Sequence, residues 1–286
     1  MRVIRKIKNI RREINKVKAG KKTIGFVPTM GALHEGHLSL IRQARADNDY
    51  AIVSIFVNPV QFGPKEDFKK YPRNLPRDAA LCRKEGVDII FYPDIKEMYT
   101  GDFKAYVDVQ GLSGVLCGLS RPGHFKGVAT VVAKLFNIIS PDIAYFGRKD
   151  AQQAVIIKKM TEDLNFPVKV KVMPIVRQKD GLAMSSRNTY LSKKERKDAL
   201  VLPESLGLAK DLIYRGIKDP GKVIRGMKQL IQGKGSIRID YISILDFDTL
   251  KPVKKIIDNC LIALAVRIGK TRLIDNAVIS KGRFLS

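Results

Sequence analysis

The chain has 286 residues, of which 45% are hydrophobic and 28% charged, and its formal net charge is +25. These proportions are typical of a soluble globular protein with one large or two modest domains. No apolar run reaches the roughly 18 residues of a membrane-spanning helix, and no apolar signal-type segment stands near the N-terminus, so we expect no membrane association. Cys82, Cys117 and Cys260 lie far apart, which suits neither a disulfide framework nor a zinc site and favours a reducing cytoplasm.

The positive charge is densest at the start of the chain. Residues 2–22 hold ten basic residues and one acid, Glu13. Ile10, Ile14 and Val17 recur at helical spacing, so this segment is predicted to be an amphipathic helix with a solvated basic face. Elsewhere Lys and Arg are scattered, without the interleaved aromatic residues of single-strand binders, and we expect no nucleic-acid partner.

Strand-like and helix-like segments alternate through the first 175 residues. Strands are predicted at 24–27, 51–57, 88–91, 142–146 and 168–172, and helices from residue 37 onward and at 77–85, 127–139 and 151–163. This alternation predicts an α/β fold with a parallel sheet and helices on both faces. Ligands of such sheets bind beyond the carboxyl ends of the strands, so the loops after Val27, Val57 and Phe146 are expected at one edge.

The pattern changes after residue 173, and residues 174–185 are predicted to be a hinge. A capping-box signature at 192–195 opens a helix, which Pro203 is expected to kink or break, and Asp219-Pro220 opens another. Strands are predicted at 237–245, 261–268 and 271–274, with a turn at 269–270. We therefore expect a second, smaller α+β domain at 176–286, after a first domain at 1–175.

Two of the three histidines stand in the pattern His34-x-Gly36-His37, after a strand and a glycine-containing turn and at the start of a helix. Backbone N–H groups at such a helix start bind anions, and imidazoles can donate further hydrogen bonds to phosphate oxygens. Gly36 lets the chain approach a ligand closely. The pattern favours a nucleotide-phosphate site over two ordinary structural histidines.

Polar residues follow two further strands. Asn58 and Gln61 can orient a polar substrate, or Asn58 and Pro59 can simply form a turn. Lys149 stands at a helix start, where the helix dipole disfavours a cation unless an anion binds there, and Gln153 lies one turn later.

Two loops complete the candidates. Met184-Ser-Ser-Arg187-Asn suits triphosphate oxygens, although a helix cap or turn is the simpler interpretation of this segment alone. Residues 118–127 are predicted to be a flexible basic loop, in which His124 is either a ligand-facing or a packing residue.

In order along the chain, these segments closely resemble the pantothenate synthetase (pantoate–β-alanine ligase) family. The resemblance rests on Pro-Thr-Met-Gly-Ala-Leu-His-Glu-Gly-His at 28–37, Phe-Val-Asn-Pro-Val-Gln-Phe at 56–62, Arg-Pro-Gly-His-Phe at 121–125, Phe-Gly-Arg-Lys-Asp-Ala-Gln-Gln at 146–153, Asp-Gly-Leu-Ala-Met-Ser-Ser-Arg-Asn at 180–188 and Thr-Arg-Leu-Ile-Asp-Asn at 271–276. It covers nearly the whole chain. Cys117 stands where this family often has an acidic residue.

The resemblance implies a two-step reaction. The pantoate carboxylate attacks the α-phosphorus of ATP to give pantoyl adenylate and pyrophosphate, and the β-alanine amine then displaces AMP to give pantothenate. It also implies Mg2+ with the nucleotide, a cytoplasmic homodimer, and a Rossmann-like nucleotide-binding domain followed by a smaller C-terminal lid domain.

The resemblance further implies roles for individual residues. His37, His34 and Lys149 match catalytic positions, His37 as proton donor and Lys149 on phosphate. Gln61 and Gln153 match pantoate positions, and Gln61 also a β-alanine position. The ATP-binding positions are Met30, Gly31, Ala32, Leu33, His34, Glu35, Gly36, His37, Gly147, Arg148, Lys149, Asp150, Val176, Met184, Ser185, Ser186 and Arg187.

Two other functions stay open at this point. An adenylyl- or cytidylyltransferase with a different acceptor would share His-x-Gly-His with the same superfamily, and Gln61 and Gln153 argue for pantoate. A basic nucleic-acid-binding module is favoured only by net charge and would show affinity that falls steeply with salt.

Overall fold

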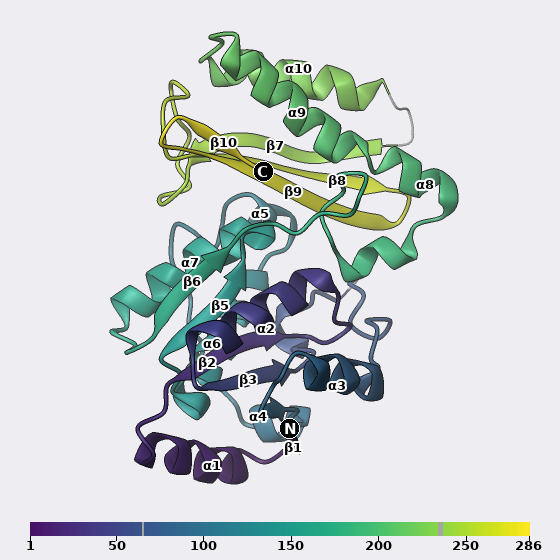
Figure 1. Cartoon of the computed structure of the whole chain (residues 1–286). Helices are drawn as coiled ribbons and strands as arrows, with labels where there is room; N and C mark the ends of the chain where they lie inside the picture. The colour runs from purple at the N-terminus through teal and green to yellow at the C-terminus, as the bar shows by residue number, and fades with distance from the viewer. Residues whose placement is uncertain (65, 234–236) are drawn as a thin grey trace. The chain divides into compact units, whose positions relative to one another are not determined.

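A computed structural model describes residues 1–64, 66–233 and 237–286 (Figure 1). Contacts group the chain into two compact units. The first comprises residues 1–114, 121–148 and 156–173, and the second comprises 115–120, 149–155 and 174–286. The expected division into folding domains at residue 175 is not tested by this grouping and stays a prediction.

The first unit is built on a six-stranded sheet. Its strands are β1 (Arg2–Ile4), β2 (Ile24–Thr29), β3 (Tyr50–Ile55), β4 (Ile89–Phe91), β5 (Ile143–Gly147) and β6 (Lys169–Met173), in the order β1-β4-β3-β2-β5-β6. Every neighbouring pair is parallel. The predicted α/β parallel sheet is therefore confirmed. The chain steps outward from β2 to β3 and β4, and then in the other direction from β5 to β6, so the sheet has a switch point between β2 and β5, where ligands of this architecture bind.

The helices of this part of the chain are α1 (Ile7–Ala19), α2 (Glu35–Asp47), α3 (Leu75–Lys84), α4 (Ile95–Met98), α6 (His124–Ile139) and α7 (Ala151–Asp163), with short 3-10 turns at Pro59–Gln61 and Arg148–Asp150. The predicted amphipathic α1 buries Ile10, Ile14 and Val17. It begins only at Ile7, because residues 2–4 form the edge strand β1, which sequence periodicity did not reveal. The predicted loop at 118–127 was wrong in part, since helix α5 (Cys117–Ser120) and the first turn of α6 occupy much of it.

The second unit carries the antiparallel sheet β7 (Ile237–Asp246), β8 (Cys260–Ile268), β9 (Thr271–Ser280) and β10 (Arg283–Leu285), in the order β10-β9-β8-β7. Helices α8 (Lys193–Asp198), α9 (Val201–Tyr214) and α10 (Pro220–Gln232) follow a 3-10 turn at Ser186–Tyr190. Ser192 and Glu195 form the predicted capping box, and Asp219 caps α10. The break expected from Pro203 falls between α8 and α9, which leaves the proline in the first turn of α9, where the missing N–H costs little.

The two faces of the C-terminal sheet differ in what covers them. Leu273, Ala277 and Ile279 of β9 belong to the hydrophobic core that α9 and α10 complete. Because side chains alternate along a strand, Arg272 and Asn276 face the other side. There they bond residues 115–120 and 149–155: Arg272 lies 3.3 Å from Cys117 Sγ, and Asn276 donates to the carbonyl of Lys149.

No helix in the three described stretches is long and apolar enough to cross a membrane.

Candidate active site

The loop after β2 is shaped by a buried carboxylate that sequence reasoning missed. Asp78 of α3 is 1% exposed and accepts the backbone N–H groups of Ala32 (2.8 Å) and Leu33 (2.9 Å). Gly31 and Ala32 both have positive φ, +82° and +52°, a conformation that costs Ala32 energy. The hydrogen bonds to Asp78 hold the loop in this conformation. The signal available in the sequence was an acid, Asp78, one helical turn before the apolar Cys82 and so on the same face of the predicted helix.

The two histidines cap α2. Gly36 N–H donates to Nδ1 of His34 (3.2 Å), His34 N–H donates to Nδ1 of His37 (3.4 Å), and the ring centroids are 4.1 Å apart. In a neutral ring, an Nδ1 that accepts a hydrogen bond leaves the proton on Nε2. Both imidazoles therefore carry Nε2–H donors, beside the positive end of the α2 dipole.

The other two candidates at this helix start are Glu35 and Gly36. Gly36 supplies the N–H that orients His34. The carboxylate of Glu35 is exposed and pairs with Arg42. This acid is unsuited to contact a phosphate with its side chain, so its candidate contribution is its backbone N–H.

Gln61 lies at the carboxyl-end side of β3 in a fixed orientation. It is 8% exposed, its Oε1 accepts from Asn58 Nδ2 (3.0 Å), and its Nε2 points at Met30 Sδ (3.2 Å). Asn58 is itself held by Tyr99, whose hydroxyl donates to Asn58 Oδ1 (2.8 Å). The expected turn at Asn58 is present and also orients Gln61, so the two interpretations of this segment are compatible.

His124 packs against the same turn. Its Nδ1 lies 2.8 Å from the carbonyl of Gln61 and its Nε2 lies 2.9 Å from a guanidinium nitrogen of Arg121. The carbonyl can only accept and the guanidinium can only donate, so the ring is neutral with its proton on Nδ1. Arg121 also forms a bidentate pair with Glu66 (2.6 Å for each contact). Burial alone would raise the pKa of Glu66, but the hydrogen bonds from Arg121 hold that pKa below its usual range.

A pocket of about 150 Å3 lies between the loops after β2, β3 and β4. Met30, Gly31 and Asp78 line it together with Phe56 and Tyr92. Two residues of the predicted ATP-binding segment therefore border a concave, largely apolar space, as expected of small-molecule sites.

The loop after β5 begins at the switch point. β2 and β5 pair through Gly25 with Ile143 and Phe26 with Ala144. An added Cβ at Gly147 would meet no described atom within 4 Å, so this glycine leaves open space beside the 3-10 turn Arg148–Asp150 that directly follows it. Arg148, which follows, is half-buried.

Lys149 opens the part of this loop that belongs to the second unit. Its side chain is 21% exposed and its ammonium lies 3.7 Å from the Asp150 carboxylate. Gln153 in the first turn of α7 is half-buried. The adjacent Gln152 is structural, because it accepts from Cys117 N–H (3.0 Å) and donates to the Val115 carbonyl (2.7 Å).

The predicted hinge contains a tight hairpin. Met184 N–H donates to the Val176 carbonyl (2.9 Å), Gln178 N–H donates to the Leu182 carbonyl (2.8 Å), and Arg177 bridges to Ala183. Ser185 caps the following 3-10 turn by accepting from Arg187 N–H (3.3 Å), as the simpler interpretation predicted. Val176 and Met184 are thereby paired, and Ser186 and Arg187 follow directly.

No cluster of three or more His, Cys, Asp or Glu side chains suited to a metal occurs among the described residues. Within the described parts of the chain, a Mg2+ ion would therefore have to bind largely through waters and substrate phosphates, as this ion typically does.

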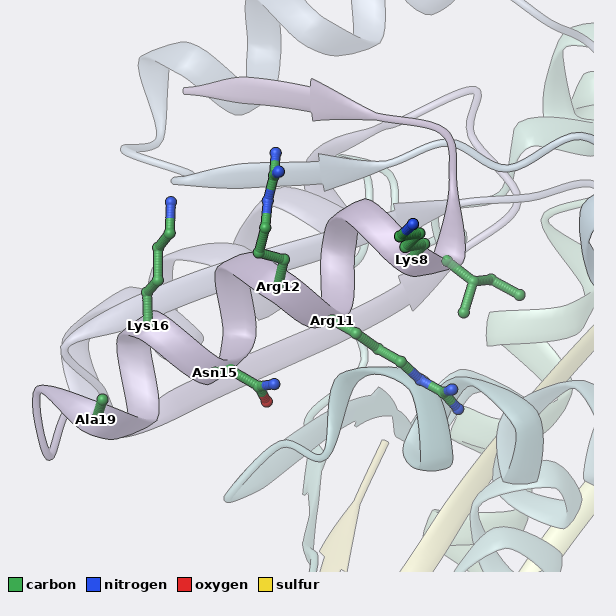
Figure 2. Close-up of a pocket in the computed structure, with 7 residues that line it drawn as sticks. Lys8, Arg11, Arg12, Asn15, Lys16 and Ala19 are labelled. Carbon is green, nitrogen blue, oxygen red and sulfur yellow. The ribbon is translucent and has the colours of Figure 1, made fainter.

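A separate surface depression lies along α1, lined by Lys8, Arg11, Arg12, Asn15 and Lys16 with Ile7 and Ala19 (Figure 2). It is the exposed basic face predicted for this helix, and none of the candidate site residues borders it.

Comparison with known proteins agrees with this arrangement. A family model described as pantoate-beta-alanine ligase matches residues 2–278. The pantothenate synthetase of Caldicellulosiruptor saccharolyticus is 56% identical over 98% of this chain and 99% of its own length, and that of Acetivibrio thermocellus is 53% identical over the same shares.

Solved structures agree too. Pantothenate synthetase from Thermus thermophilus has a TM-score of 0.92 and 42% identity over 96% of this chain and 98% of its own. The pantoate-beta-alanine ligase of Francisella tularensis, described as complexed with beta-gamma ATP and beta-alanine, has a TM-score of 0.79 and 35% identity over 96% and 97% of the two chains. From its motifs, its fold and these relatives, the chain belongs to the pantoate-beta-alanine ligase (pantothenate synthetase) family.

Proposed function

We propose that this enzyme joins pantoate and β-alanine at the expense of ATP, through a pantoyl-adenylate intermediate. Family membership and the nucleotide and β-alanine named for the Francisella tularensis structure support the substrates. The observation that carries the chemistry is that Nδ1 of His34 and Nδ1 of His37 each accept a backbone N–H, which leaves Nε2 of each ring as the donor.

In the first step, a carboxylate oxygen of pantoate attacks the α-phosphorus of ATP and pyrophosphate departs. The substrate supplies the nucleophile, so the protein has to position the reactants and stabilise charge. His34 and His37 donate from Nε2 to phosphate oxygens, and His37 is the proton donor. Lys149 and Arg187 neutralise phosphate charge. Removal of one such donor typically slows a reaction about 100- to 1000-fold.

The remaining ATP contacts follow the motif positions. Met30 to Leu33, Glu35, Gly36, Gly147, Arg148 and Asp150 border the nucleotide, Val176 contacts the base through its main chain, and Met184 to Ser186 enclose the triphosphate.

Gln61 and Gln153 bind pantoate in this proposal. Asn58 bonds the amide oxygen of Gln61, so the Nε2 group of Gln61 points away from Asn58. Gln61 therefore presents N–H donors, which suit a carboxylate or hydroxyl oxygen. Gln61 also orients β-alanine, whose amine attacks the adenylate carbonyl in the second step and releases AMP.

We propose that Mg2+ binds together with the nucleotide phosphates, because the described residues gather no cluster of side chains suited to hold a metal. We further propose that the enzyme is a cytoplasmic homodimer whose C-terminal domain acts as a lid.

An omission assay tests the reaction. The protein is mixed with ATP, Mg2+ and pantoate, with and without β-alanine, and pyrophosphate, AMP and pantothenate are measured. We expect about one pyrophosphate per active site without β-alanine and continuous formation of AMP and pantothenate with it. No pantothenate under either condition contradicts the proposal. A panel of other carboxylic acids tests for a different acceptor, and turnover with one of them but not with pantoate would assign the enzyme another substrate.

A further inference from the structure

The motif Thr-Arg-Leu-Ile-Asp-Asn at 271–276 lies on β9, and the proposed reaction gives its residues no role. Two of them, Asp275 and Asn276, are buried polar side chains, with exposed fractions of 2% and 3%. Buried polar groups are costly unless they are hydrogen-bonded. Their partners therefore indicate why the strand carries them.

Asn276 bonds the segment that carries Lys149. Its Nδ2 donates to the backbone carbonyl of Lys149 (2.9 Å). This carbonyl lies in the 3-10 turn Arg148–Asp150, directly before α7. The bond fixes the point from which the Lys149 side chain extends.

Asp275 bonds the hairpin that carries Val176 and Met184. Its two oxygens accept from the guanidinium of Arg177 at 2.8 and 3.0 Å, and Arg177 also donates to the Gly181 carbonyl (2.9 Å). One Asp275 oxygen also accepts the N–H of Asn276 (2.8 Å). The ion pair thus ties the first strand of the hairpin to β9, and through the same guanidinium it also holds the turn at Gly181.

Adjacent residues of a strand face opposite sides of the sheet. Asp275 and Asn276 can therefore reach two segments that a single side chain cannot reach, and both segments carry proposed ATP contacts. All of these residues belong to the second unit. We propose that Asp275 and Asn276 are positioning residues for ATP, Asn276 through Lys149 and Asp275 through Arg177 and the hairpin.

This inference rests on the proposed function, so the wild-type protein is assayed first for Mg2+–ATP binding and for pantoate-dependent pyrophosphate release. Failure of the wild type in both assays refutes the proposed function whatever the variants do. With an active wild type, every result below bears on the positioning role alone.

A double-variant cycle tests Asn276. We expect Asn276→Ala to weaken ATP binding, measured by calorimetry, and to slow adenylate formation about 10- to 100-fold, since misplacement of a binding group by about 1 Å has effects of this size. In a Lys149→Ala background the same substitution should change ATP affinity less than threefold, because no ammonium remains to be positioned. Equal losses in both backgrounds would overturn the role.

Asn48→Ala is the matched control. Asn48 is also a buried asparagine that donates to a backbone carbonyl, that of Ala44 (2.9 Å), and to Tyr145 Oη (2.8 Å). It caps the carboxyl end of α2, about 20 Å along the helix from the histidine cap at ~1.5 Å per residue. It should lose stability without a change in ATP affinity. An Asn276→Ala variant that behaves like this control refutes the inference.

The Asp275 role is tested by removing the pair in two stages. Asp275→Asn alone removes the carboxylate that pairs with the half-buried Arg177 guanidinium, which keeps only its bond to the Gly181 carbonyl, and is expected to lower the melting temperature. Adding Arg177→Met removes the unpaired charge, so the melting temperature should recover while ATP affinity stays at least tenfold weaker than in the wild type. Recovery of ATP affinity together with stability would show that the pair is only structural.

Discussion

Gly127 in the first turn of α6 is the position where one added methyl group should be most informative. A Cβ there would lie 2.6 Å from the Val60 carbonyl oxygen and 2.7 Å from both the backbone nitrogen and the Cα of Gln61. These are backbone atoms, so no flexible side chain can move aside. Gly127→Ala therefore has to displace the 3-10 turn at Pro59–Gln61 by about 0.8 Å to reach ordinary van der Waals contact at 3.4 Å.

The displaced turn carries the proposed pantoate residue Gln61, and the Gly127 carbonyl accepts from Asn58 (3.1 Å), the residue that orients Gln61. A shift of this size is expected to lower kcat/KM for pantoate about 10- to 100-fold. Overpacking should cost about 1–3 kcal/mol of stability. At ~2–4 °C per kcal/mol, that is a fall in Tm of about 2–12 °C. The assays are pantoate-dependent pyrophosphate release and thermal unfolding followed by circular dichroism.

Gly207→Ala in α9 is the matched control, because an added Cβ there meets nothing within 4 Å. Replacing an exposed helix glycine by alanine typically stabilises by about 1 kcal/mol, so this variant should melt slightly higher with unchanged kinetics. If Gly127→Ala kept the wild-type kcat/KM for pantoate, the proposed link between helix packing and substrate binding would be refuted.

Three further predictions concern other parts of the first unit. Asp78→Asn should destabilise by about 1–3 kcal/mol, since it removes the charged acceptor of two loop N–H groups, and should weaken Mg2+–ATP binding; calorimetry with unchanged ATP affinity would contradict this. Arg121 holds the pKa of Glu66 low, so this carboxylate adds stability above pH 4.5, its ordinary pKa, that is lost as the pH falls through the lowered value. The difference in Tm between wild type and Glu66→Gln should therefore shrink below pH 4.5, and a constant difference would refute it. Burial raises the pKa of Cys82 to about 12, so iodoacetamide should label it far more slowly in the folded than in the unfolded protein, as mass spectrometry can measure; equal rates would contradict its burial.

Much of the fold could be predicted from local patterns. Alternating apolar segments predicted the parallel sheet, and the capping residues Ser192 and Asp219 predicted two helix starts. Both predictions were possible because hydrophobic periodicity and helix capping depend on residues that are neighbours in the sequence. The edge strands β1 and β10 were missed. Each has three residues and is defined by pairing to a distant strand, β4 or β9, rather than by its own sequence.

The candidate site likewise contains residues that the local sequence reveals and residues that it does not. The two histidines were visible because they flank a glycine at a helix start, and Lys149 was visible because the helix dipole disfavours a cation at such a position. Asp78 and Asn276 were not, because their roles depend on bonds to backbone atoms 46 and 127 residues away. His124 was ambiguous in sequence, and its contact with the Gln61 carbonyl identifies it as a residue that supports the turn.

Isotope transfer gives the most direct test of the central claim that a substrate carboxylate attacks the α-phosphorus of ATP. Pantoate labelled with oxygen-18 in both carboxylate positions is incubated with the enzyme, ATP, Mg2+ and β-alanine, and the AMP and pyrophosphate are analysed by mass spectrometry. The proposed chemistry predicts one oxygen-18 atom in each AMP and none in pyrophosphate, because the attacking oxygen stays on the phosphorus when the amine cleaves the adenylate. Unlabelled AMP, or label in pyrophosphate, would contradict it.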